Sequence, residues 1–111
     1  ASEYLLQAHD MALTDPKIIT NLAFIHYKLG NYDTTLELLQ KVIPFDPHNF
    51  LNYYQLGQVY EKKKMYTEAI QAYQTCVSVN STYSIGWNNL GDLYTQLNKK
   101  DLAKSAYSHA K

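Results

Sequence analysis

Arginine is absent from the 111 residues of this chain, and cysteine occurs once, as Cys76. Nucleic-acid binders commonly use guanidinium groups on a broad basic surface, whereas here ten lysines are balanced by ten acidic residues. We therefore expect no nucleic-acid partner. A single cysteine cannot form an internal disulfide or a sulfur-rich metal site, which favours a reducing, cytoplasmic location.

Long hydrophobic runs are also missing, although 46% of the residues are hydrophobic. No segment approaches the roughly 20 consecutive apolar residues that a membrane-spanning helix needs, so no membrane insertion is expected. The N-terminus has no positively charged segment leading into an apolar stretch. Because residue 1 is Ala1 rather than methionine, we expect the chain to begin within a longer protein.

Residue types that carry enzyme chemistry are scattered along the sequence. His9, His26, His48 and His109 fall on different predicted segments, without i, i+4 spacing and without a nearby acidic cluster, so no metal site is expected. There is no Gly-rich phosphate loop, and Cys76 occupies a predicted core position. We expect no catalytic residues and no cofactor, hence a protein that is not an enzyme.

The chain does contain a repeat with a spacing of 34 residues. Tyr53, Leu56, Gly57, Tyr60, Ala69 and Tyr73 are followed 34 positions later by Trp87, Leu90, Gly91, Tyr94, Ala103 and Tyr107. A common offset across such unlike residue types indicates a stack of similar units. Within each unit the apolar positions recur at the helical spacing of three and four residues, and short links make the two helices of a unit antiparallel.

This pattern predicts the helices and their grouping. Six helices are expected over residues 16–29, 33–43, 50–63, 67–79, 84–97 and 101–110. The corresponding repeats are residues 16–49, which diverge most, 50–83 and 84–111, the last truncated and without a capping helix. Residues 1–15 are predicted to be the second helix of a preceding partial repeat, giving about seven helices in all.

The motif within these units resembles a tetratricopeptide repeat. The residues that carry the resemblance are Trp87-x-x-Leu90-Gly91-x-x-Tyr94 followed by Ala103, Tyr107 and Ala110, with the same pattern over residues 50–83. The resemblance covers about residues 16–111. It implies an all-α fold, a right-handed superhelix of stacked antiparallel helix pairs, and a role in protein–protein interaction.

Small residues and the chain end give two further expectations. Gly57 should pack against Ala69, and Gly91 against Ala103, because small residues let two helices approach closely. Since no capping helix follows the last repeat, Ala103, Ala106, Tyr107 and Ala110 should leave an exposed apolar strip, covered by another helix of the parent protein or by a neighbouring molecule.

A ligand of such a superhelix is expected on its concave face, which the first helix of each pair lines. Once the predicted core positions on those helices are set aside, the candidate peptide-binding residues are Asn21, Phe24, Tyr27, Leu51, Tyr54, Gln55, Gln58, Ile85, Asn88, Asn89 and Asp92. Apolar members could bind peptide side chains. Alternatively, several of them pack between repeats.

Three side-chain amides occupy equivalent positions, Asn21, Gln55 and Asn89. An amide can both donate to and accept from a peptide backbone, and a similar asparagine ladder is known in the tetratricopeptide superhelix of O-linked N-acetylglucosamine transferases. The resemblance implies that these residues hold a peptide backbone. The alternative is that each amide only bonds a neighbouring helix.

The expected partner is a protein segment in extended conformation. One tetratricopeptide subgroup binds the acidic tail of heat-shock chaperones through lysine, arginine and asparagine, but the matching positions here include Thr20, Phe24 and Ile85. Without those cations a terminal carboxylate would be desolvated without compensation, so a chaperone tail is not expected. Two alternatives remain open: a structural or targeting segment of a larger enzyme or assembly, such as a glycosyltransferase superhelix, and a self-association module.

Overall fold

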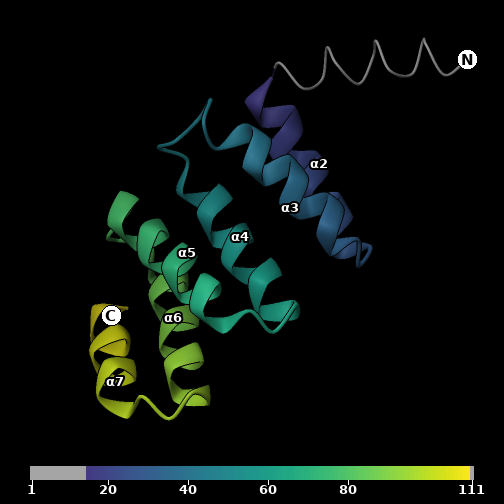
Figure 1. Cartoon of the computed structure of the whole chain (residues 1–111). Coiled ribbons are helices and arrows are strands. Elements are labelled where there is room, and N and C mark those ends of the chain that lie inside the picture. Colours follow the sequence, from purple (N-terminus) through teal and green to yellow (C-terminus); the bar gives the residue numbers. More distant parts are fainter. Residues whose placement is uncertain (1–14, 111) are drawn as a thin grey trace, which may run out of the picture. The chain divides into compact units, whose positions relative to one another are not determined.

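All regular secondary structure within residues 15–110, the part that the computed structural model describes, is α-helical (Figure 1). The six helices are α2 (Pro16–Lys28), α3 (Tyr32–Val42), α4 (Phe50–Lys62), α5 (Tyr66–Val79), α6 (Ser84–Gln96) and α7 (Lys100–His109). Each end lies within one residue of the predicted boundary, so the six helices are confirmed. The helix predicted over residues 1–15 lies outside the described residues, apart from Asp15, which caps α2.

The three helix pairs turn in the same way. Gly30, Lys64 and Asn98, spaced 34 residues apart, all have positive φ, at 82°, 62° and 62°. In each turn the amide of the following residue donates to a carbonyl in the last turn of the preceding helix, over 2.8 Å. A left-handed residue that closes a helix in this way lets the chain reverse within a few residues. The repeat therefore extends to the backbone conformation of its turns.

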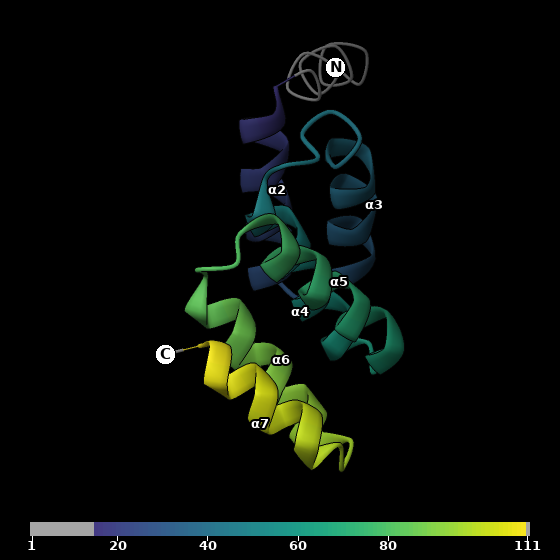
Figure 2. The same ribbon diagram turned by 90° about the vertical axis from the view of Figure 1, so that its left-hand side faces the viewer.

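The chain divides into two compact units, with the boundary between Pro47 and His48. In the first unit α2 packs against α3 as a helical hairpin (Figure 2). Ile19 and Ala23 of α2 are buried, together with Leu39 of α3. Asp15 and Pro16 start the hairpin, since the Asp15 side chain accepts a hydrogen bond from the amide of Lys17 at 3.0 Å and proline suits the first helical position.

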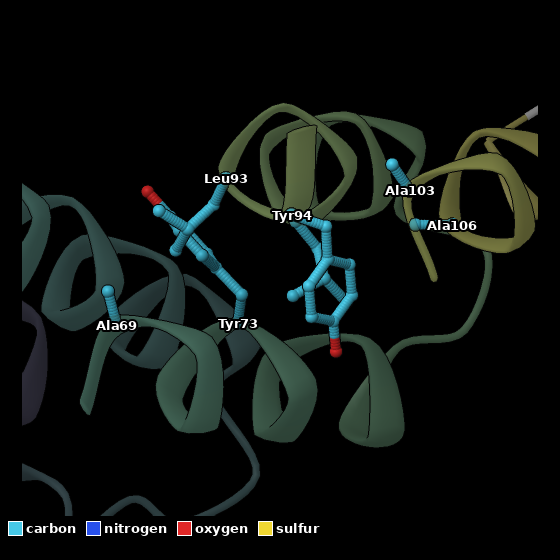
Figure 3. Close-up of a cluster of buried hydrophobic side chains, with 7 residues drawn as sticks. Ala69, Tyr73, Leu93, Tyr94, Ala103 and Ala106 are labelled. Carbon is cyan, nitrogen blue, oxygen red and sulfur yellow. The ribbon is translucent and has the colours of Figure 1, made fainter. Parts of the chain in front are cut away.

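In the second unit, α4 packs on α5, α5 on α6, and α6 on α7. Its core is built from alternate faces of these helices: Ala69 and Tyr73 of α5, Leu90, Leu93 and Tyr94 of α6, and Ala103 and Ala106 of α7 (Figure 3). Small residues on α7 and bulky ones on α5 and α6 interlock, which gives the close packing of a protein interior. This core holds α4 and α6 in place for the site described below.

The side chains nearest to the glycines of α4 and α6 are tyrosines, rather than the alanines that we predicted. A Cβ atom on Gly57 would lie 2.6 Å from the ring of Tyr73, and one on Gly91 would lie 2.7 Å from the ring of Tyr107. The predicted partners were Ala69 and Ala103, one helical turn earlier. The glycines thus make room for a tyrosine ring lying across the helix.

The predicted apolar strip on the last helix is correct for Tyr107, which is exposed, but wrong for two of its alanines. Ala103 and Ala106 are buried in the core of the second unit, so they expose almost no surface. The apolar residues that α7 does expose are Leu102, at 48%, and Tyr107, at 37%.

One helix of the first unit leaves apolar residues uncovered. Ile25 of α2 is 51% exposed, whereas Val59 and Leu93, at the equivalent positions 34 and 68 residues later, are fully buried. In the second unit Leu93 is covered by the preceding helix α5. The uncovered Ile25 is consistent with a further helix before α2, which stays a prediction.

Candidate functional site

The predicted site residues fall on three helices. Leu51, Tyr54, Gln55 and Gln58 lie on α4, and Ile85, Asn88, Asn89 and Asp92 lie on α6, all within the second unit. We call the surface that these eight residues form the α4–α6 face. Asn21, Phe24 and Tyr27 lie on α2 in the first unit, and they are described on their own below.

Tyr54 is the centre of a hydrogen-bond network on the α4–α6 face. Its hydroxyl oxygen accepts a hydrogen bond from the Asn89 side-chain amide at 3.0 Å and another from the Gln58 amide at 3.2 Å. Gln58 in turn accepts from Gln55 at 3.1 Å. Because both bonds to the Tyr54 oxygen are donated by amides, the hydroxyl hydrogen itself remains to be donated to another acceptor.

Two further tyrosines hold the ring of Tyr54. The Tyr83 ring meets it edge-on at 5.5 Å between centroids, and the Tyr73 ring lies tilted at 6.0 Å, arrangements that aromatic quadrupoles favour. Burial raises the pKa of Tyr54, so its hydroxyl stays protonated across the physiological range. The hydroxyl is therefore a fixed, neutral donor.

One carboxylate on α4 and one on α6 each accept a hydrogen bond from a tyrosine of the helix that follows, α5 or α7. The Tyr73 hydroxyl donates to Glu61 at 2.7 Å, and the Tyr107 hydroxyl donates to Asp92. Burial first, and the bond to Glu61 second, raise the pKa of Tyr73, whereas the bond to Asp92 is the main reason that the pKa of Tyr107 is raised. These bonds orient both carboxylates.

The repeat pattern identified Tyr73 and Tyr107 only as repeat positions and gave no role to Tyr83. In the structure these three tyrosines position the α4–α6 face, because each contacts one of its side chains. The spacing of 34 residues between Tyr73 and Tyr107 was visible, but it could not show which polar side chain each hydroxyl would meet.

The amide ladder is only partly present. Gln55, which we expected to be accessible, is 7% exposed, because its side chain folds back to bond Gln58 on the same helix. Asn89 is half-buried and bonds Tyr54 of the neighbouring helix, as the alternative interpretation of the ladder predicts. Asn21 is exposed, but it belongs to the first unit, so it is not placed relative to the other two.

The other predicted residues are accessible to different degrees. Leu51, Ile85, Asn88 and Asp92 of the α4–α6 face are exposed, and so is Phe24 of α2. The Lys28 ammonium lies 5.1 Å from the centre of the Phe24 ring, in a cation–π contact. Tyr27 is half-buried and packs on Tyr32 at 5.7 Å between centroids.

Residues with metal-binding or nucleophilic potential do not gather at this face. Among residues 15–110, no group of histidine, cysteine, aspartate and glutamate has the geometry to hold a metal ion. Cys76 is fully buried in α5, and burial raises its pKa to about 11, which keeps the thiol protonated and unreactive. No helix within the described residues is long and apolar enough to span a membrane.

Comparison with protein families finds three matches along this chain. Models described as tetratricopeptide repeat match residues 52–83 and 86–111, and a model described as TPR repeat matches residues 23–64. A stretch of 81 residues is 31% identical to heat shock protein STI1 of Saccharomyces cerevisiae. That match covers 72% of this chain and 14% of STI1.

Solved structures with the same fold were also found. A crystal structure of MamA has a TM-score of 0.85 at 23% identity, over 97% of this chain and 61% of MamA. A chain of the CopN–Scc3 complex has a TM-score of 0.82 at 18% identity, over 87% and 57%. MamA from Desulfovibrio magneticus RS-1 gives 0.80 at 19%, over 85% and 53%. At such identities the likeness shows the fold alone, and this chain spans less than two thirds of each of these proteins.

Proposed function

Because the chain belongs to the tetratricopeptide repeat family, we propose that it is a protein-interaction module that binds an extended peptide segment on the α4–α6 face, without catalysis and in the cytoplasm. The observation that supports this most is the Tyr54 hydroxyl. It accepts two amide hydrogen bonds and keeps its own hydrogen for an outside acceptor. A peptide carbonyl is such an acceptor.

Besides the Tyr54 hydroxyl, the side-chain amides around it can form hydrogen bonds with a peptide backbone. Asn88 is exposed, and Gln58 and Asn89 are partly exposed, so each can use a remaining donor or acceptor position towards a ligand. Gln55 is buried and acts through Gln58, which it orients. In this proposal the internal bonds of the amides prepare the site, because groups held in place lose less entropy on binding.

Leu51 and Ile85 provide the apolar part of the proposed site. They occupy equivalent positions at the starts of α4 and α6, and both are exposed. Covering them with ligand side chains removes apolar surface from water, which adds affinity that hydrogen bonds alone do not give. The preferred ligand therefore carries a branched aliphatic or aromatic residue near its contact with these two positions.

Our proposal does not include an acidic chaperone tail as the ligand. The relevant positions on the α4–α6 face hold Gln55, Ile85 and Asn89, none of which is a cation, and Glu61 and Asp92 add negative charge to α4 and α6. A pair of ligand carboxylates would be repelled there rather than paired. The match with heat shock protein STI1 covers 14% of that protein and does not transfer its partners.

The function can be tested with peptides selected from a random display library on the immobilised protein. Tyr54→Phe removes only the hydroxyl, and Asn88→Ala removes an exposed amide. We expect each variant to bind a selected peptide about 3- to 15-fold more weakly by calorimetry, since one hydrogen bond contributes about 1 kcal/mol.

The matched control is Gln71→Ala, which removes an exposed amide from the outer helix α5. It should leave the affinity unchanged. If no peptide can be selected, or if Gln71→Ala weakens binding as much as Tyr54→Phe does, the α4–α6 face is not the binding site.

A further inference from the structure

A second candidate site lies in the same unit, away from the α4–α6 face. A cavity of about 310 Å³ opens between α5, α6 and α7. Its apolar lining includes Val77, Trp87, Leu90 and Leu102, and its polar edge is formed by Ser78 and Ser105. At one end, Gln74 donates a hydrogen bond to the Tyr94 hydroxyl at 2.8 Å.

The preceding repeat provides an internal comparison for this cavity. A hollow of about 210 Å³ lies at the equivalent place on α4 and α5, lined among others by Tyr53, Leu56 and Glu68. In the last repeat Glu68 is replaced by Leu102, which is 48% exposed, and Tyr53 by Trp87. The change makes the cavity of the last repeat apolar and suited to an apolar ligand.

The cavity has the size for one aromatic side chain. A cavity of about 150 Å³ can hold a benzene molecule, so about 310 Å³ accommodates a phenyl ring with part of its backbone. The indole of Trp87 is held in place on two sides: it donates to the Ser81 carbonyl at 2.9 Å and stacks on the His109 ring at 4.3 Å. The wall of the cavity is therefore preformed.

Such a side chain is present on the first unit of this chain. Phe45, in the loop after α3, is 75% exposed, more than any other large hydrophobic residue described. The loop is not a loose one: the amides of Phe45 and Asp46 donate to the Val42 carbonyl at 3.0 and 2.9 Å, and Pro44 and Pro47 flank the pair. A side chain presented by a fixed loop loses little entropy on binding.

We propose that Phe45 of one copy of this chain inserts into the cavity between α5, α6 and α7 of a second copy. The inserting loop and the receiving cavity are different surfaces, so the contact is heterologous: the copy that donates Phe45 keeps an unused cavity, and the copy that receives it keeps an unused loop. Further copies can add at these two surfaces at high concentration, as an open chain or a closed ring. This self-association is separate from peptide binding on the α4–α6 face, which it leaves accessible on every copy.

Two single substitutions test the inserting loop and the receiving cavity independently. Phe45→Ser removes the inserted ring, and Leu102→Glu places at the cavity the residue that the preceding repeat carries there, Glu68. Both positions are exposed, so both variants should fold, as thermal unfolding would check. Leu29→Ser, which removes another well-exposed apolar side chain of the first unit, is the control.

Sedimentation equilibrium over micromolar to millimolar concentrations measures the outcome. We expect the wild type and Leu29→Ser to associate as concentration rises, and Phe45→Ser and Leu102→Glu each to associate about tenfold more weakly or not at all. Mixed in equal amounts, the two variants should form a heterodimer that grows no further, because the mixture contains one intact loop and one intact cavity per pair.

Trp87, the only tryptophan of the chain, reports on the cavity directly. When Leu102→Glu also carries Trp87→Phe, the emission of a mixture comes only from the cavity of the Phe45→Ser protein, and it should shift to shorter wavelength on mixing. A monomeric wild type, unchanged association of Phe45→Ser, or a mixture without heterodimer overturns the proposal. A monomeric wild type whose emission depends on Phe45 would instead place the ring in its own chain's cavity.

Discussion

At the scale of single residues, the contacts that matter most are those in which a tyrosine lies across a glycine. Gly57 and Gly91 each face a tyrosine ring, but the two rings differ in how easily they can move aside. Tyr73 is fully buried, whereas Tyr107 is 37% exposed. The repeat pattern identified both glycines as packing positions. It did not identify the ring as the partner, because the direction of a tyrosine side chain depends on its rotamer and on the polar group that its hydroxyl reaches.

This difference leads to a prediction for alanine substitutions. Gly57→Ala places a methyl group against a buried ring that cannot move away, so it should lower the free energy of unfolding by about 1–3 kcal/mol. Gly91→Ala is the matched variant, and it should cost less, because the exposed Tyr107 ring can shift into solvent. Urea denaturation measures both values. Equal losses for the two variants would contradict the role given to Tyr73.

At the scale of helices, the sequence predicted the boundaries well, because three independent signals coincide. The apolar spacing gives the length of each helix, Asp15 and Pro16 start the first one, and the left-handed residue recurs at Gly30, Lys64 and Asn98. Gly30 and Asn98 are residue types that adopt this conformation readily. Lys64 adopts it because the packing of the paired helices requires it, overriding the local preference.

Helix α5 supplies a pH-dependent prediction through Cys76. The folded state holds the pKa of this buried thiol at about 11, whereas its ordinary value is 9.0. As pH rises through 9, the unfolded chain loses the thiol proton while the folded chain keeps it, so the unfolded state binds fewer protons and stability falls between about pH 9 and 11.

Cys76→Ala, which introduces the residue that the last repeat has at this position, Ala110, removes that contribution. Guanidinium denaturation under reducing conditions at pH 8 and pH 10 should therefore show a larger loss of stability for the wild type than for the variant. The buried tyrosines titrate in both proteins, so the difference isolates the thiol. A variant that loses as much stability as the wild type would contradict this assignment.

At the scale of the whole molecule, the repeat predicted the all-α architecture, but not the hydrogen bonds that the candidate site residues form. The line of Asn21, Gln55 and Asn89 followed from equivalent positions alone. In the second unit Gln55 turns inward and Asn89 bonds Tyr54, because half-buried amides must be satisfied within the fold. Equivalent repeat positions therefore predict where a residue lies on its helix, whereas its hydrogen-bond partners depend on the neighbouring side chains.

The central claim is that a peptide lies on the α4–α6 face, and amide chemical-shift mapping tests it most directly. On titration of the ¹⁵N-labelled protein with a selected peptide, the side-chain NH₂ signals of Gln58, Asn88 and Asn89 should shift together with the backbone amides of α4 and α6. The NH₂ signals of Gln71 and Gln74 on the outer side of α5 should stay in place. Shifts confined to the cavity between α5, α6 and α7, or spread evenly over all helices, would contradict the account.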